Sequence, residues 1–324
     1  MARTTTSAIT GAFSYTGRYL ARRLLDDGQR IVNLTNHPNR PVAFSPAELA
    51  RIRTLPLDLA DEVALARALE GVDVLYCTWW IRFAVGGDTH QKAAARLQRF
   101  FGLAKGAGVR KVVFSSHTRA REDSPYAYLA GKATAEQHLR ESGIDYAIVR
   151  PCGIFGDGAS ESILMNNAAY VLRRTPLFLL AGSGNDRFQP IHVRDMAALC
   201  QYLGESVSSG EERDACGPDA PTARELFTRV ARACGSRAFV AAPGLPTRLV
   251  TMMTKPLDLW TGDILLDTDD LDLMCSGLTV ADDPNDAAIA SRRSLFAWLD
   301  EVGPELGREY VSSVKRYYDK PRPS

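Results

Sequence analysis

The sequence has almost no excess of charge of either sign. Its 324 residues include 39 lysines and arginines against 38 aspartates and glutamates, which gives a formal net charge of +1. Proteins that bind nucleic acids or acidic surfaces usually carry a clear basic excess, which this chain lacks. The sequence also lacks any run of about 18 uninterrupted apolar residues, the length that a membrane-spanning helix needs. We therefore expect neither a nucleic acid nor a membrane among its partners.

Cysteine is scarce and scattered along the chain. The six cysteines form no C-x-x-C pair, and no grouping of His, Cys and Asp has the spacing of a metal site. We expect buried free thiols in a reducing compartment, no disulfide framework and no bound metal. The first residues run directly into a short apolar segment at 7–9, which leaves no room for a signal peptide and favours a cytoplasmic protein.

The composition that is present, 45% hydrophobic and 24% charged, is that of an ordinary globular protein. Up to residue 150, short strands rich in Val, Ile and Leu alternate with amphipathic helices. The pattern predicts strands at 7–9, 30–35, 52–57, 72–77, 111–116 and 145–150, and helices at 18–25, 61–69, 88–106 and 127–142. This alternation is typical of the α/β class and predicts a Rossmann-type doubly wound parallel sheet with helices on both faces. Such sheets bind ligands at the carboxyl ends of their strands.

After Pro151 the pattern changes, and loops rich in Gly, Asp and Ser separate the elements. We expect helices at 163–173, 193–203, 222–234, 246–260 and 287–302, strands at 189–192 and 238–241, and a solvated acidic loop at 267–272. Residues 4–150 then form a dinucleotide-binding Rossmann domain, and residues 187–205 return to its core. Residues 151–186 and 206–324 form a smaller C-terminal α/β lobe that binds the substrate.

The segment from Thr10 to Gly17 (TGAFSYTG) follows the first strand and opens the first helix. A sharp turn on glycine into a helix leaves backbone N–H groups unpaired at the positive end of the helix dipole, where a dinucleotide diphosphate binds. Ser14 stands where such loops often have glycine, and its hydroxyl can itself bond a phosphate oxygen. The alternative is an ordinary glycine turn. The predicted cofactor contacts here are Gly11, Phe13, Ser14, Tyr15, Thr16 and Gly17.

The end of the second strand, residues 35–40, holds no acidic residue. NAD-binding proteins usually place a carboxylate there to hold the ribose 2′-hydroxyl, and a carboxylate would repel a 2′-phosphate. The donors available to such a phosphate are Asn36, His37 and Arg40. NADP(H) is therefore favoured over NAD(H), with a solvated loop cation as the alternative for Arg40. Asp58 and Leu59, after the third strand, are expected to bracket the adenine, and the alternative for Asp58 is capping of the next helix.

Tyr128 and Lys132 stand four residues apart in a predicted helix, so their side chains share one face. An ammonium group lowers the pKa of a neighbouring phenol, which can then pass a proton to or from a carbonyl oxygen during hydride transfer. Ser115 and Ser116 end the preceding strand, and a hydroxyl there can steady the same oxygen. The predicted catalytic set is Tyr128, Lys132 and Ser116.

These motifs together resemble the short-chain dehydrogenase/reductase superfamily, as does the segment 145–156 (DYAIVRPCGIFG). The stretches 186–197, 217–226 and 298–303 are similar to its atypical extended branch, which includes NmrA-like proteins and the nucleotide-binding accessory subunit of respiratory complex I. The resemblance implies Tyr128 as the acid/base, Lys132 on the nicotinamide ribose and Ser116 as the polarising hydroxyl. Further cofactor contacts that it implies are Thr78, Trp79, Ser115, Pro151, Gly153 and Ile154.

Two positions depart from the pattern of that branch. Ser14 replaces the middle glycine of the loop, and His117 stands where extended members often have Ser or Thr. The second departure leaves open whether Ser115, Ser116 or His117 faces the substrate.

Aromatic residues follow the fourth strand. Because Trp79 and Trp80 are adjacent, both cannot point into the core, so one of them is expected to face a cleft suited to an apolar or aromatic substrate. Packing under a loop is the alternative. His90 falls within a helical pattern and is expected to be a surface residue or a satisfied core residue.

The favoured function is an NADPH-dependent reductase or dehydrogenase that acts on a carbonyl or activated double bond of an apolar small molecule. One alternative is a non-catalytic NADP(H)-binding protein that senses redox state or supports an assembly. Another is a sugar-nucleotide epimerase or dehydratase. In each case the expected partner is a small molecule, and the chain is expected to be a monomer or a homodimer.

Overall fold

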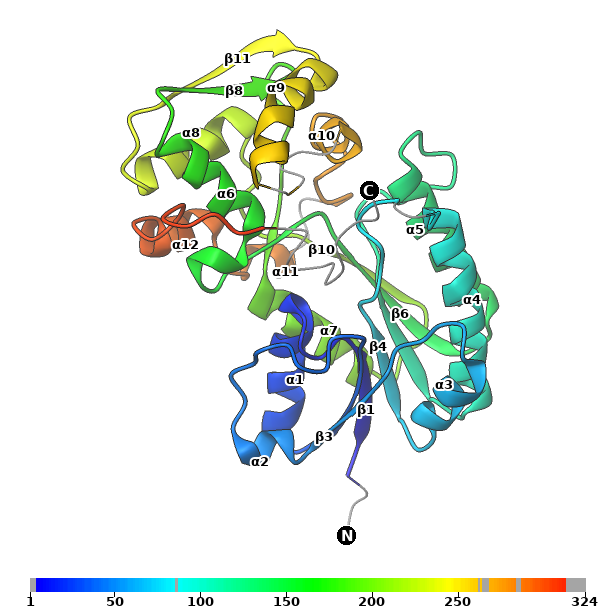
Figure 1. Ribbon diagram of the computed structural model, residues 1–324. Helices are drawn as coiled ribbons and strands as arrows, with labels where there is room; N and C mark the ends of the chain where they lie inside the picture. The colour runs from blue at the N-terminus through cyan, green and yellow to red at the C-terminus, as the bar shows by residue number, and fades with distance from the viewer. Residues whose placement is uncertain (1–3, 85–86, 262, 264–267, 284–286, 313–324) are drawn as a thin grey trace. The chain divides into compact units, whose positions relative to one another are not determined.

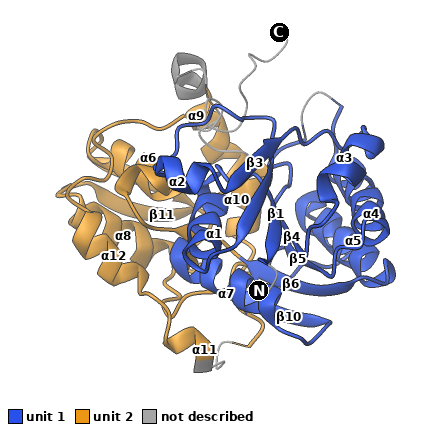
Figure 2. Cartoon of the chain, turned by 90° about the horizontal axis from the view of Figure 1, so that it is seen from below, with its two compact units in different colours: residues 1–151, 193–215 blue, residues 152–192, 216–324 orange. Residues whose placement is uncertain are grey.

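The computed structural model describes residues 4–84, 87–261, 263, 268–283 and 287–312. The chain divides into two compact units, which Figure 2 colours separately. Unit 1 consists of Met1–Pro151 and Val193–Ala215, and unit 2 of Cys152–His192 and Cys216–Ser324. The roles expected for these two parts, cofactor binding and substrate binding, stay predictions.

Unit 1 contains a seven-stranded sheet in the order β10-β6-β5-β4-β1-β2-β3, and every neighbouring pair in it is parallel. The predicted doubly wound parallel sheet is therefore confirmed. The strand order reverses between β1 and β4, which is where open α/β sheets bind their ligands. The strands are β1 (Thr6–Thr10), β2 (Arg30–Leu34), β3 (Ile52–Leu55), β4 (Val74–Cys77), β5 (Lys111–Ser115), β6 (Asp145–Pro151) and β10 (Glu211–Ala215).

Helices cover both faces of this sheet (Figure 1). On one face α3, α4 and α5 pack side by side, and on the other α1 packs against α7. The near-continuous apolar character of the strands follows from this double cover, because neither face meets water. The helices of unit 1 are α1 (Tyr15–Asp26), α2 (Pro46–Leu49), α3 (Glu62–Leu69), α4 (His90–Gly106), α5 (Ala127–Glu141) and α7 (Val193–Glu205).

The core under α3, α4 and α5 contains large aromatic side chains. Phe100 and Phe101 of α4 and Phe114 of β5 are almost completely buried, and the rings of Phe101 and Phe114 meet edge to face with centroids 5.8 Å apart. Burial of one such side chain stabilises a fold by about 1.5–3 kcal/mol. This packing holds the carboxyl ends of β4 and β5 in place beneath the helices.

Unit 2 has its own apolar core, built from α6, α8 and α12 and from two small parallel sheets, β11–β8 and β7–β9. Fully buried residues such as Phe155, Leu226 and Leu299 lie at its centre. Its strands are β7 (Ile154–Phe155), β8 (Leu177–Ala181), β9 (Ile191–His192) and β11 (Phe239–Leu245). Its helices are the 3-10 helix Ala159–Glu161, α6 (Ile163–Leu172), α8 (Ala223–Ala233), α9 (Thr247–Thr261), α10 (Thr268–Met274), α11 (Ala287–Ala290) and α12 (Leu295–Val302).

Several expectations about this second half were wrong. The acidic run belongs to helix α10 rather than to a loop, and Asp267 lies outside the described residues. The helix expected at 287–302 is two helices, because Ser294 caps a new one by accepting a hydrogen bond from the amide of Ala297 (3.2 Å). Strand β10 (EERDA) was not predicted because an edge strand with one exposed side needs no apolar run.

The sequence predicted free thiols and no membrane-spanning helix. All six cysteines are free, and five of them are buried while Cys275 is partly exposed. Within the described ranges, no helix combines the length and the apolar character needed to cross a membrane.

Candidate functional site

The loop between β1 and α1 turns sharply on glycine. Gly11 has φ +83°, and its amide donates a hydrogen bond to the carbonyl of Leu34 (2.8 Å). A Cβ on Gly17 would lie 2.0 Å from the carbonyl oxygen of Gly11, so the helix can approach the loop only because Gly17 has no side chain. Ser14 caps the helix by accepting a hydrogen bond from the amide of Gly17 (3.2 Å).

This turn leaves the amides of Phe13 and Thr16 without a hydrogen-bond partner in the part of the chain that the structure describes. Phe13 itself is buried against Phe44, with ring centroids 6.2 Å apart, and Tyr15 contacts Tyr19. Unpaired amides at the start of a helix, beside backbone that tolerates no side chain, form a cradle that fits a diphosphate.

Asn36, after β2, has a structural role that the sequence did not indicate. Its Nδ2 donates to the carbonyl of Leu57 (2.9 Å), and its Oδ1 accepts from the amide of the same residue (3.2 Å). The side chain thus ties the end of β2 to the segment after β3. His37 and Arg40 are half-buried, and their contact with a 2′-phosphate stays a prediction.

The pair Asp58 and Leu59 only partly fits its predicted role. The side chain of Leu59 packs into the hydrophobic core, so only its backbone remains to contact an adenine. Asp58 is exposed and accepts a hydrogen bond from the amide of Ala60 (2.9 Å). The alternative that Asp58 caps the next helix was wrong, because Asp61 does so through the amide of Ala64 (2.9 Å).

Threonines join β1 and β4 at the point where the strand order reverses. The hydroxyl of Thr10 accepts hydrogen bonds from the amides of Thr78 (2.8 Å) and Trp79 (2.9 Å), and the hydroxyl of Thr78 donates to the carbonyl of Thr10 (2.6 Å). The predicted contacts Thr78 and Trp79 therefore lie directly beside the glycine loop.

Lys132 lies deep in unit 1 and is only 3% exposed. Its Nζ donates a hydrogen bond to the carbonyl of Ser115 (2.6 Å) and lies over the rings of Trp80 (4.5 Å) and Phe114 (4.9 Å). Burial lowers the pKa of Lys132 to about 7, although the carboxylate of Glu136 opposes this shift. The side chain of Lys132 can therefore gain or lose its proton near neutral pH.

Tyr128, one turn before Lys132 on α5, sits in an aromatic cluster. Its ring meets those of His90, His117 and Trp80 edge to face, with centroids 5.4, 5.6 and 6.2 Å away. Trp80 stacks on His90 with an interplanar angle of 11°. Because Lys132 and Tyr128 both contact the indole of Trp80, the structure brings the predicted acid/base pair into one group of side chains.

His90 was expected on the surface or in a satisfied core position, and its place beside Tyr128 was missed. It is the first residue of α4, and a Cβ added to Gly131 of α5 would lie 2.7 Å from the Cβ of His90. Glycine at 131 thus allows α4 and α5 to approach closely enough for His90 to reach Tyr128. Only the packing of two helices reveals this, since no local pattern in the sequence indicates it.

The three residues after Phe114, which are Ser115, Ser116 and His117, make different contacts. The carbonyl of Ser115 holds Lys132, whereas the side chain of Ser116 is 3% exposed and its hydroxyl has no partner among the described residues. The ring of His117 shares a hydrogen bond with the carbonyl of Thr118 (2.8 Å), and since a carbonyl only accepts, Nδ1 carries the proton. Which of the three faces a substrate stays a prediction.

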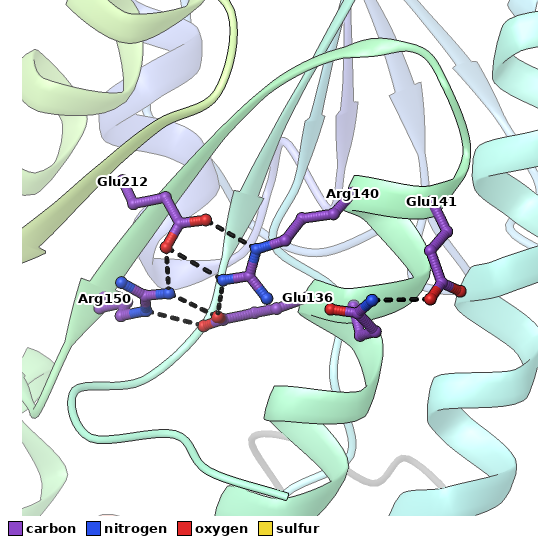
Figure 3. Close-up of polar contacts among 6 residues, drawn as sticks. Glu136, Arg140, Glu141, Arg150 and Glu212 are labelled. Carbon is purple, nitrogen blue, oxygen red and sulfur yellow. Dashed lines mark hydrogen bonds and ion pairs between the residues drawn. The ribbon is translucent and has the colours of Figure 1, made fainter.

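One turn beyond Lys132, two arginines and two glutamates form a partly buried ion cluster, defined here as Glu136, Arg140, Arg150 and Glu212 (Figure 3). Glu136 is 2% exposed and accepts hydrogen bonds from Arg140 Nη2 (2.9 Å), Arg150 Nε (2.8 Å) and Arg150 Nη2 (2.5 Å). Burial disfavours ionisation of Glu212, but the bonds from both arginines outweigh it and hold the pKa of Glu212 below its usual value. The ion cluster links α5, β6 and β10 one turn beyond Lys132.

The predicted contacts Pro151, Gly153 and Ile154 lie at the change from unit 1 to unit 2. The carbonyl of Pro151 accepts a hydrogen bond from the amide of Thr118 (3.2 Å). In unit 2, a Cβ on Gly153 would lie 2.4 Å from the ring of Phe188, and Ile154 pairs with Ile191 in the β7–β9 sheet. Their contact with a nicotinamide stays a prediction.

Known proteins with similar sequences and structures include NAD(P)H-binding proteins and reductases. A family model described as NAD(P)H-binding matches residues 11–173, half of the chain. The chain is similar to the ceramide reductase of Caulobacter vibrioides, with 32% identity over 234 residues that cover 71% of each chain. It is also similar to subunit 9 of the mitochondrial NADH dehydrogenase [ubiquinone] 1 alpha subcomplex of Dictyostelium discoideum, with 27% identity over 232 residues, or 69% of this chain and 62% of that one.

The chain spans 56% and 62% of the length of the subunits of this kind from Arabidopsis thaliana and Dictyostelium discoideum. Among solved structures, the NADPH-dependent quinone oxidoreductase of Escherichia coli, complexed with NADPH, has a TM-score of 0.70 at 23% identity and covers 93% of this chain and 99% of that one. That likeness shows a shared fold. The chain therefore belongs to the NAD(P)H-binding family, and its resemblance to the atypical extended branch of the short-chain dehydrogenase/reductase superfamily is confirmed.

Proposed function

We propose that the protein is an NADPH-dependent reductase of a carbonyl, or of an activated double bond, in an apolar or aromatic small molecule. The observation that carries this proposal is the pairing, on α5, of Tyr128 with a buried Lys132 in one aromatic cluster. The strand that precedes this helix ends next to Ser116, whose buried hydroxyl has no partner among the described residues. A protein that only stored a nucleotide would need the glycine loop but not this set of polar groups.

Each residue of the set has a distinct role in the proposed reaction. The hydroxyl of Ser116 donates a hydrogen bond to the substrate oxygen and polarises the carbonyl. The phenol of Tyr128 donates the proton that this oxygen needs as the alcohol forms. Lys132, held by the carbonyl of Ser115 (2.6 Å), places a positive charge beside the phenol and so favours release of that proton.

The glycine loop would hold the cofactor diphosphate through the amides of Phe13 and Thr16 and the hydroxyl of Ser14. When bound, the nicotinamide supplies the hydride that the reduction requires. Preference for NADP(H) over NAD(H) is supported by His37 and Arg40 and by the lack of an acid at residues 35–40. Lys132 would contact the nicotinamide ribose, as the family resemblance implies.

An apolar or aromatic substrate is supported by the rings around Tyr128, which leave little room for a strongly hydrated ligand. Two similar proteins are named as enzymes of this class, the Caulobacter ceramide reductase and the Escherichia coli NADPH-dependent quinone oxidoreductase. Unit 2 is the proposed source of further substrate contacts. A cytoplasmic location and a monomeric or homodimeric state remain predictions.

Titration of protein fluorescence with NADPH and NADH tests the first half of this proposal. We expect saturable binding of both nucleotides, with the tighter constant for NADPH. Tyr128→Phe tests the second half, because it removes the proton donor but leaves the nucleotide cradle intact. Turnover should be lost while NADPH affinity stays within about twofold, and a Tyr128→Phe enzyme with normal turnover would refute the mechanism.

A second function, nucleotide binding without turnover in support of an assembly, has its own observation in its favour. Several similar proteins are described as complex I subunits, and another as a photosystem II assembly factor from Cyanophora paradoxa, 27% identical over 147 residues. Slow exchange of bound nucleotide, with no oxidation of NADPH by any quinone, aldehyde or ketone tested, would favour this alternative.

A further inference from the structure

Among the described residues of unit 1, the buried donors without a hydrogen-bond partner include the hydroxyl of Ser116, the indole Nε1 of Trp80 and the hydroxyl of Tyr76. Folded proteins pair the great majority of such groups, because an unpaired buried donor destabilises the fold. Trp298 shows the usual arrangement, since its Nε1 donates to the carbonyl of Asp157 (2.8 Å).

Two of these donors, Ser116 and Trp80, lie at the carboxyl ends of neighbouring strands. Lys132 Nζ lies 4.5 Å from the ring centre of Trp80 and 2.6 Å from the carbonyl of Ser115, whose peptide bond leads directly to Ser116. Trp80 follows β4 and Ser116 follows β5, and these strands are neighbours in the sheet. Trp80 therefore lies beside Lys132 and also contacts Tyr128, and Ser116 directly follows the residue whose carbonyl binds Lys132.

The indole of Trp80 is held in a fixed orientation. One contact is the ammonium group of Lys132, another is the stacked ring of His90, and a third is the edge-to-face ring of Tyr128. A ring restrained from several sides cannot turn its N–H towards water at little cost. A ligand that supplies an acceptor would explain why the Nε1–H of Trp80 is buried without a partner among the described residues.

We infer that the indole N–H of Trp80 binds the substrate and selects carbonyl compounds whose second acceptor oxygen is on a carbonyl one carbon removed from the reducible carbonyl. This inference rests on the proposed function and deepens it. Ser116 and Tyr128 serve the oxygen that is reduced, and Trp80 serves the second oxygen, as a β-diketone or a β-keto ester or amide would present. A simple ketone leaves the indole N–H unpaired, and sites built to pair a polar group discriminate strongly against ligands that cannot pair it.

The test compares two probes with the same carbon skeleton, benzoylacetone and butyrophenone, of which only the first has a second carbonyl. Their binding is measured by calorimetry on protein saturated with NADP+, at a pH where the diketone is neutral. We expect the wild type to prefer benzoylacetone by roughly tenfold, the effect of one hydrogen bond to a buried donor. Trp80→Phe should lower this preference about fivefold or more while NADPH affinity stays unchanged.

Two further variants serve as a control and as a substitute for Trp80→Phe. Trp298→Phe removes an indole N–H that already has a partner in unit 2, so it should reduce thermal stability but leave the preference unchanged. If Trp80→Phe folds poorly, benzothienylalanine at position 80 preserves the ring shape and removes only the N–H.

Three results would overturn the inference: no preference in the wild type, a preference that persists in Trp80→Phe, or an equal loss of NADPH affinity in that variant, which would place the indole against the cofactor. Because the readout is equilibrium binding, a lack of turnover would count against the proposed reductase and not against the role of Trp80.

Discussion

Replacement of Glu136 by glutamine removes a carboxylate that is 2% exposed and that accepts three hydrogen bonds from Arg140 and Arg150. Glutamine preserves the shape of the side chain but lacks the charge. Arg150, whose side chain is 17% exposed, then keeps only Glu212 as a charged partner in the ion cluster. The perturbation therefore leaves a mostly buried guanidinium group incompletely neutralised.

The expected cost follows from this geometry. Removal of one partner of a buried ion pair typically costs about 3–5 kcal/mol. Because Glu212 still binds both arginines, we expect the lower end, about 3 kcal/mol for Glu136→Gln. A unit of this size loses about 2–4 °C of melting temperature for each kcal/mol, so the transition of unit 1 should fall by about 6–12 °C.

The assay is calorimetric unfolding, combined with hydrogen exchange of the α5 amides. The exchange data assign the shifted transition to unit 1, since a chain of two units need not unfold in one step. Glu141→Gln is the matched control, because Glu141 is on the same helix, is exposed and pairs only with Gln137 among the described residues (2.6 Å; Figure 3). It should change stability by less than about 0.5 kcal/mol. Equal small shifts for both variants would refute the view that the buried charge matters.

Three other substitutions test the cofactor loop, the buried lysine and the cofactor preference. Gly17→Ala forces a Cβ to within 2.0 Å of the Gly11 oxygen. It should therefore weaken NADPH binding by roughly tenfold or more in a fluorescence titration. The control Gly106→Ala has open space for a Cβ and should leave NADPH binding unchanged. Burial lowers the pKa of Lys132 to about 7, so the fold gains stability as pH rises from there towards the unfolded value of about 10.4. Lys132→Met should therefore raise the free energy of unfolding most below pH 7, by on the order of 4–5 kcal/mol, as measured by denaturant unfolding at several pH values. A gain that does not shrink towards alkaline pH would contradict the shift. Arg40→Asp should move the ratio of NADPH to NADH affinity towards NADH by roughly tenfold, and an unchanged ratio would remove Arg40 from the phosphate site.

Much of unit 1 was predictable from local pattern. The apolar runs at 111–116 and 145–150 became β5 and β6 with small changes at their ends, because strands buried on both faces must be apolar throughout. The glycines at 11 and 17 indicated a tight turn into a helix, and both are required by backbone geometry that any other residue would strain. Unit 2 was harder, because its strands and helices are short and half-exposed, and α10 begins inside an acidic run that has no apolar periodicity.

The sequence alone determined the fold, through the alternation of strands and helices, and the family, through the glycine loop, the serine pair, Y-x-x-x-K and the later segments that resemble it. These features depend on patterns and spacing within single elements. The surroundings of Tyr128 were decided only by tertiary structure. His90 and Trp80 reach it from α4 and from the end of β4, and the ion cluster joins Glu136 to arginine and glutamate from other elements. Contacts of this kind depend on how closely helices and strands approach one another, and that distance is set by packing across the whole core rather than by any neighbour in the sequence.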